Sequence, residues 1–165
     1  MSQHNVETNT SEYAKFVGAI KLVRIRLANC EIDTAVSILR PKEIETKIEQ
    51  SNQRNVELLE TSGLILFEQK TNLIFLKQSN QNELARISAT YELEYHVDSD
   101  YPMPENAELF LNTFERYNLP LNAYPFLREF VHNMMGRMNF PILTLPLLQP
   151  ETPNTDELET QDSAT

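Results

Sequence analysis

Three histidines are the first candidates for acid–base chemistry in this chain. His96 lies beside Glu94 and Asp98, and a His next to carboxylates could act as a general base. His132 falls on the polar side of a helical segment, and His4 stands near the start of the chain. Each position is typical of a solvated side chain rather than of a catalytic base, so the histidines do not predict an active site.

Other reactive groups are equally isolated. Cys30 is the single cysteine, which excludes an intramolecular disulfide and a Cys-based zinc site, and it has no evident His partner for nucleophilic catalysis. Arg128 and Glu129 could form an acid–base pair, but adjacent helix positions point in different directions, which favours structural salt bridges instead. The three glycines are far apart, so no loop could cradle a phosphate. We therefore expect no enzymatic activity, no metal and no cofactor.

The charge of the chain limits its partners. Its 165 residues suffice for one domain with a core, and 24 acidic against 14 basic residues give a net charge of −10. This balance argues against nucleic acid, whose phosphates need basic patches. The first residues lack the features of a secretory signal, and no run of about 18 apolar residues could be inserted in a membrane. These observations predict a cytoplasmic protein.

The two ends of the chain are more polar than its middle. We expect residues 1–12 to be a disordered N-terminus, residues 13–150 to form the folded domain, and residues 151–165 to be a disordered acidic tail. The tail holds five acids, one Leu and no Lys or Arg. It could therefore bury too little apolar surface to offset the loss of chain entropy.

The clearest secondary-structure signal is an alternation over residues 83–97, which predicts a half-buried strand. Its apolar face comprises Ala85, Ile87, Ala89, Tyr91, Leu93, Tyr95 and Val97. Residues 16–27 predict a second strand, because from residue 22 onward an apolar and a largely basic face alternate. The apolar face holds Val23, Ile25 and Leu27, and the opposite face holds Leu22, Arg24 and Arg26.

Weaker patterns fill the rest of the sheet region. Residues 30–41 predict a crossover or a long loop. Residues 42–49 favour a short exposed strand, although their apolar spacing also suits a helix. Residues 64–67 and 73–76 are β-favouring runs, joined either within one long strand or by a turn.

Helical patterns follow the strands. After two prolines, residues 105–117 carry apolar residues in helical register. Asn118–Asn122, which includes Pro120, predicts a break, and a second helix would begin at Pro125, since a Pro suits the first helical turn. Strands followed by helices predict an α+β fold, in which an antiparallel sheet has helices packed on one face.

Residues 124–146 join this second helix to an apolar ribbon. The helix places its apolar residues on one broad face, which comprises Phe126, Leu127, Phe130, Val131, Met134, Met135 and Met138. Pro141, Pro146 and Pro150 keep the ribbon out of the middle of a sheet. The ribbon therefore either packs on the body of the protein or is left open as a binding surface.

This segment resembles the signature of the SecB chaperone family. The signature has an aromatic and a Pro opening a helix, an Arg-Glu pair, a Met-containing stretch, an Arg, and Phe-Pro-x-Leu-x-Leu. The matching residues are Tyr124, Pro125, Arg128, Glu129, Met134, Met135, Arg137, Phe140, Pro141, Leu143 and Leu145. Elsewhere the match is one of layout. The resemblance implies a four-stranded antiparallel sheet, a homo-oligomer built as a dimer of dimers, and ATP-independent binding of unfolded or aggregation-prone polypeptides.

The resemblance also implies where clients bind. In SecB-like proteins the client groove lies between the connection after this helix and the crossover loop after the first strand. The corresponding residues are Ile38 and Leu39 on one side, and Phe140, Ile142, Leu145, Leu147 and Leu148 on the other. Ordinary packing is the alternative explanation for each of them. Core packing is also favoured for the helix methionines, although their flexible side chains could adapt to varied clients.

Three roles remain open. Export SecB docks the motor SecA through acids on and after its first strand, where this chain has Arg24, Arg26 and Ala28, which argues against SecA docking. A second SecB-like branch holds the aggregation-prone antitoxin of a toxin–antitoxin system, and residues 121–145 resemble that branch at least as well. The third role is an adaptor module that binds one specific folded partner.

Overall fold

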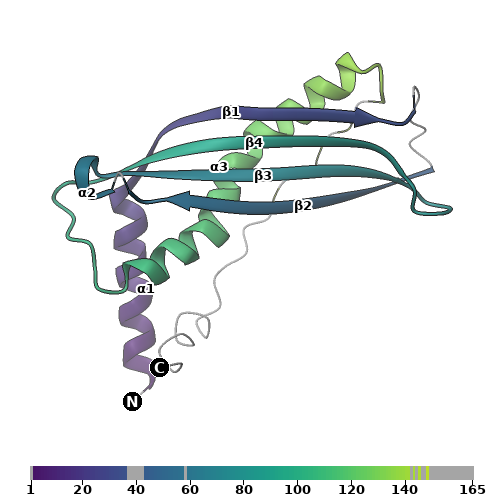
Figure 1. Cartoon of the computed structure of the whole chain (residues 1–165). Helices are drawn as coiled ribbons and strands as arrows, with labels where there is room; N and C mark the ends of the chain where they lie inside the picture. The colour runs from purple at the N-terminus through teal and green to yellow at the C-terminus, as the bar shows by residue number, and fades with distance from the viewer. Residues whose placement is uncertain are drawn as a thin grey trace.

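The computed structural model describes residues 2–36, 43–57, 59–141, 143, 145 and 148, with side chains from residue 11 onward except residues 60 and 61. The elements in chain order are α1 (Ser2–Ala19), β1 (Ile20–Thr34), β2 (Ile44–Asn55), α2 (Leu59–Ser62), β3 (Leu64–Lys77), β4 (Glu83–Val97) and α3 (Ala107–Arg137). The four strands form one antiparallel sheet in the order β1-β4-β3-β2. β1 and β2 are therefore its edges (Figure 1).

The core lies between the sheet and α3, which crosses one face of it (Figure 1). We call this the inner face. The seven β4 residues predicted to share a face all lie on it, and none is more than 6% exposed. Phe114 of α3 packs against the rings of Tyr95 at 5.1 Å and Phe67 at 5.7 Å. Each such fully buried large side chain contributes about 1.5–3 kcal/mol. The predicted α+β fold with a helical layer on one face is thus confirmed.

α3 is one continuous helix, so the predicted break over Asn118–Asn122 is wrong, and Pro125 lies inside a helix rather than at its start. An internal proline removes one backbone hydrogen bond and crowds the preceding turn. Here the sheet outweighs that cost, because Leu119 and Ala123 are buried against it. Pro125 points to solvent, and Pro120 is half-buried. Tertiary packing therefore outweighs the tendency of the two prolines to end the helix.

α3 ends at Arg137, with Met138 as its C-cap. The N–H of Phe140 donates to the carbonyl of Met135 at 3.0 Å, and the N–H of Asn139 donates to that of Gly136 at 3.1 Å. Asn139 has φ 57°. These features define a Schellman motif, in which the buried side chains of Phe140 and Met135 supply the accompanying apolar contact. The part of the SecB-like signature from Met135 to Phe140 thus forms the C-terminal end of a helix.

The segment before the sheet differs from the expectation of a strand from residue 16. α1 extends to Ala19, and β1 begins only at Ile20. Phe16 is fully buried, 5.5 Å from the ring of Phe110. The hydroxyl of Tyr13 donates to Asn118 Oδ1 at 2.6 Å. The last turns of α1 therefore pack on α3, which the sequence alternation beyond residue 22 does not reveal.

β1 and β2 are longer than predicted, whereas β4 has the predicted bounds. β1 continues to Thr34, so the start of the expected loop over residues 30–41 is strand, and residues 37–42 lie outside the described residues. β2 is a strand rather than the alternative helix, and β3 is one long strand rather than two. The extra length comes from pairing with the neighbouring strands, β1 with β4 and β2 with β3, which no local pattern encodes.

Candidate polypeptide-binding surface

A β-bulge in β1 decides which side chains face which way. The register passes from Leu22 opposite Tyr95 to Arg24 opposite Glu94, so Val23 is an extra residue. Residues directly opposite each other point to the same side of a sheet. Leu22 therefore joins Ile25 on the inner face. The prediction that Leu22 shares a face with Arg24 is wrong, because strict alternation does not allow for a bulge.

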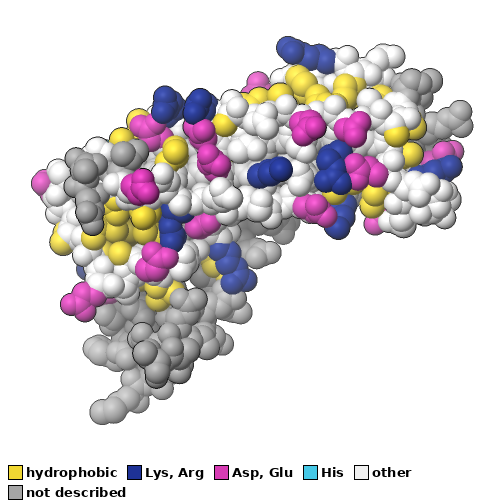
Figure 2. Space-filling model, viewed as in Figure 1, with side chains coloured by type: hydrophobic (Ala, Val, Ile, Leu, Met, Phe, Trp, Pro, Cys, Tyr) yellow, Lys and Arg dark blue, Asp and Glu magenta, His cyan; other side chains and the backbone are white. Residues whose placement is uncertain are grey.

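The inner face of β1 is left open. Leu22, Leu27 and Ile32 are 36–41% exposed, and we call these three residues the β1 face. Hydrophobic side chains are visible along the edge of the molecule formed by β1 (Figure 2). Exposed apolar patches usually mark interaction sites. The unpaired edge of a sheet can in addition accept a further strand through its free backbone groups.

α3 borders the β1 face. The hydroxyl of Tyr91 donates to the carbonyl of Phe126 at 3.1 Å, and Tyr91 is paired with Leu27. The side chain of Phe126 is 41% exposed, so α3 also carries an exposed apolar side chain at this turn. Burial raises the pKa of Tyr91 to about 12, and the charge of Glu129 adds to this shift. Tyr91 therefore stays neutral at the base of this surface.

The predicted client ribbon is only partly exposed. Phe140 and Leu145 are buried, and Leu148 is 38% exposed. Ile142 and Leu147 lie outside the described residues, as do Ile38 and Leu39 on the opposite side of the predicted groove. Packing in the core describes Phe140 and Leu145, and Leu148 is the exposed one among the described client-binding candidates of the ribbon.

The other residues of the SecB-like signature mostly serve the helix. Tyr124 and Met135 are buried, whereas Met134 is half-buried and packs against the core. Arg128 is half-buried; Glu129 and Arg137 are exposed, as is Pro141. Core packing therefore describes the methionines better than an open surface does.

The candidate catalytic side chains are not brought together. Cys30 is exposed on β1, His96 is exposed on β4 and His132 is exposed on α3. Among the described residues, no three His, Cys, Asp or Glu side chains are grouped so that they could hold a metal ion. Within the same part of the chain, no helix is both long and apolar enough to cross a membrane.

The outer face of the sheet carries paired charges. Arg24 Nη2 lies 2.5 Å from Glu94 Oε2, and Arg26 Nε donates to Glu92 Oε2 at 2.6 Å. The two arginines come from β1 and the two acids from β4, in direct cross-strand register. Glu92 and Glu94 are therefore paired with basic neighbours within the sheet. Sequence reasoning found the arginines but not their partners.

Comparisons with known proteins identify the fold. No protein-family model matches the chain, and no curated protein does. The chain is similar to a solved structure of the Mycobacterium tuberculosis SecB-like chaperone Rv1957, which is in complex with a ChAD peptide from the Rv1956 HigA1 antitoxin. The TM-score is 0.72 and the sequence identity is 17%. The match covers 84% of this chain and 97% of that one. A Streptococcus agalactiae protein of unknown function gives a TM-score of 0.44 at 13% identity, over 77% of this chain and 96% of that one. The chain thus has a SecB-like fold.

Proposed function

We propose that this chain is an ATP-independent chaperone, a holdase that binds unfolded or aggregation-prone polypeptides. The observation that carries the proposal is the apolar ribbon after α3, in which Leu148 is exposed while Phe140 and Leu145 are packed on the core. Such a surface needs no cofactor to bind extended chains, and the net charge of −10 favours solubility. The SecB-like fold supports the same function.

The client that we favour is an antitoxin of a toxin–antitoxin system rather than an exported precursor. The structural neighbour Rv1957 was solved with an antitoxin peptide. Glu92 and Glu94 already have arginine partners within the sheet, and a basic segment such as that of SecA would have to displace them. Handover of clients to SecA is therefore not part of the proposal.

The β1 face is assigned to a second copy of the chain, in a homo-oligomer of the dimer-of-dimers type. Pairing two β1 edges would satisfy their free backbone groups and cover Leu22, Leu27 and Ile32 together. The client is assigned to the ribbon, where Leu148 is exposed, with Ile142, Leu147, Ile38 and Leu39 as further contacts. Phe140 and Leu145 anchor this ribbon to the core.

Suppression of aggregation tests the proposal. A chemically unfolded test protein is diluted into nucleotide-free buffer with and without equimolar chaperone, and light scattering is followed. We expect scattering to fall severalfold, and Leu148→Asp to restore most of it. The matched control is Val56→Asp, since Val56 is also 38% exposed but precedes α2. Identical scattering curves with and without the protein would refute the holdase function.

Copurification from the native host distinguishes the two proposed classes of client. A single small antitoxin among the bound proteins supports the dedicated chaperone, whereas a range of precursors with signal sequences supports export. The alternative of an adaptor predicts a single folded partner together with no effect on the unfolded test protein.

A further inference from the structure

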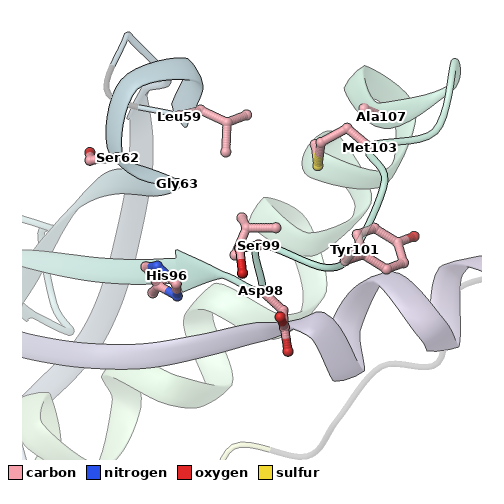
Figure 3. Close-up of a pocket in the computed structure, with 10 residues that line it drawn as sticks. Leu59, Ser62, Gly63, His96, Asp98, Ser99, Tyr101, Met103 and Ala107 are labelled. Carbon is pink, nitrogen blue, oxygen red and sulfur yellow. The ribbon is translucent and has the colours of Figure 1, made fainter.

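A pocket of about 510 Å³ opens at the end of the sheet where α2, the last residues of β4 and the loop before α3 meet. Leu59 and Met103 enter it from opposite sides, and Ser99 lies between them (Figure 3). Val97, Tyr101 and Ala107 complete a mainly apolar lining. None of these residues belongs to the β1 face or to the ribbon.

The local backbone keeps the pocket open. Gly63 follows α2 with φ +66°, and a Cβ atom there would lie 3.2 Å from the carbonyl oxygen of Val97. Its N–H donates to the carbonyl of Leu59 at 2.9 Å, and its carbonyl accepts from the N–H of Val97 at 2.8 Å. Glycine adopts this conformation without steric cost. α2 is thereby fixed against the end of β4, with Leu59 directed into the pocket.

The rim of the pocket is acidic. Asp98, Asp100 and Glu105 are the charged residues between positions 96 and 107, and the last two are exposed. Lys21 reaches Asp98 at 4.0 Å, and Arg54 is paired with Glu108 in the first turn of α3. Acidic side chains lie around a hydrophobic patch at the α2 end of the molecule, which a basic side chain also borders (Figure 2). Residues flanking an apolar anchor in this pocket would therefore be favoured as Lys or Arg.

We propose that this pocket binds an aromatic side chain of a polypeptide segment flanked by basic residues. Tyr101 and Met103 favour an aromatic ring, because aromatic rings pair well with one another and a thioether contacts ring edges favourably. The pocket lies at the start of α3 and the ribbon follows its end. At 1.5 Å per residue the 31-residue helix separates the two by about 45 Å. This site is therefore independent of the proposed holdase surface.

The test uses the full chain and the labelled peptide acetyl-KKFKK-amide, followed by fluorescence anisotropy and by the ¹³C signal of the Met103 methyl group. We expect saturable binding, a ring-current shift of Met103, and loss of both with KKSKK or EEFEE. Ser99→Trp, which fills the exposed rim, should weaken binding at least tenfold. Ser51→Trp on exposed β2 is its matched control.

A second variant covers the case in which the bulky side chain introduced at Ser99 disturbs folding. Asp100→Asn with Glu105→Gln leaves the apolar lining intact and should weaken binding severalfold while reducing its dependence on salt. Shifts of Met134 and Met138 without one of Met103 would overturn the proposal, because the peptide would then bind at the far end of α3. A Met103 shift that depends on protein concentration and not on peptide concentration would also overturn the proposal, because a second copy of the chain would then occupy the pocket.

Discussion

The side-chain amide of Asn122 donates to the hydroxyl of Tyr95 at 2.8 Å, joining the middle of α3 to the inner face of β4. Asn122→Ala leaves this buried hydroxyl without its donor, so we expect the free energy of unfolding to fall by about 1–3 kcal/mol. Urea unfolding at fixed protein concentration measures the change. Asn133→Ala, exposed on the same helix, should stay within about 0.5 kcal/mol of the parent. Equal losses in the two variants would mean that the bond contributes nothing specific.

Alkaline pH should unfold the protein through its buried tyrosines. Burial raises the pKa of Tyr95 to about 12, from an ordinary value of 10.0, although the hydrogen bond from Asn122 lowers it. A raised tyrosine pKa means that the folded state favours the neutral phenol. The resulting stability is complete below pH 10 and is lost as the pH rises through about 12.

The measurement is urea unfolding at pH 8, 10 and 11.5, with Tyr95→Phe as the comparison. Two pKa units correspond to about 3 kcal/mol, so the parent should lose stability steeply above pH 10. Tyr95→Phe should lose less, because its ring cannot ionise. Parallel curves for the two proteins would show that Tyr95 does not titrate during unfolding.

The sequence predicts the inner layer of this fold better than its edges. β4 was predicted to the residue because it is paired on both sides and covered on one face, so that its alternation is uninterrupted. β1 was predicted less well, because bulges at Val23 and Ala28 change the phase of its pattern. The break expected near Pro120 fails for a related reason, since the burial of Leu119 is a tertiary effect.

The candidate site was predicted only in part. The prolines and leucines predict an apolar ribbon after α3, and its role in client binding stays a prediction. No pattern tells which of its side chains turn inward, as Phe140 and Leu145 do. The β1 face was missed because its exposure depends on the path of α3 over the sheet. The pocket near Leu59 joins segments that are far apart in sequence, so it has no local signal.

The helix stop at Asn139 gives a sharp backbone prediction. A residue with φ 57° is strained unless it is Gly or Asn, and a β-branched side chain there costs about 1–2 kcal/mol. We expect Asn139→Gly to match or exceed the parent in urea unfolding and Asn139→Val to be less stable. Asn133 within α3 is the control, because Gly there should destabilise the helix by about 1 kcal/mol. A stabilising effect of Gly at both positions would contradict the αL assignment.

The arginines of the outer face should control its charge. Replacing Arg24 and Arg26 by Glu leaves Glu92 and Glu94 unpaired beside two new acids. We expect this variant to bind a labelled Lys-rich peptide with an affinity that falls with added salt, whereas the parent should bind it more weakly. Replacing Lys47 and Lys70 by Glu adds the same charge elsewhere on the sheet and is the control. Equal binding by both variants would mean that net charge, rather than the Glu92–Glu94 patch, attracts the peptide.

The two edges of the sheet allow a matched test of assembly. Leu27 on β1 and Ile48 on β2 are 39% and 41% exposed, and both lie on the inner face. If β1 pairs with a second copy, Leu27→Lys places a charge inside an apolar contact, whereas Ile48→Lys leaves the contact intact. Light scattering should give a multiple of 19.1 kDa for the parent and for Ile48→Lys, and a lower mass for Leu27→Lys. A lower mass for Ile48→Lys alone would move the interface to β2, and an unchanged mass for both would place it away from the sheet edges.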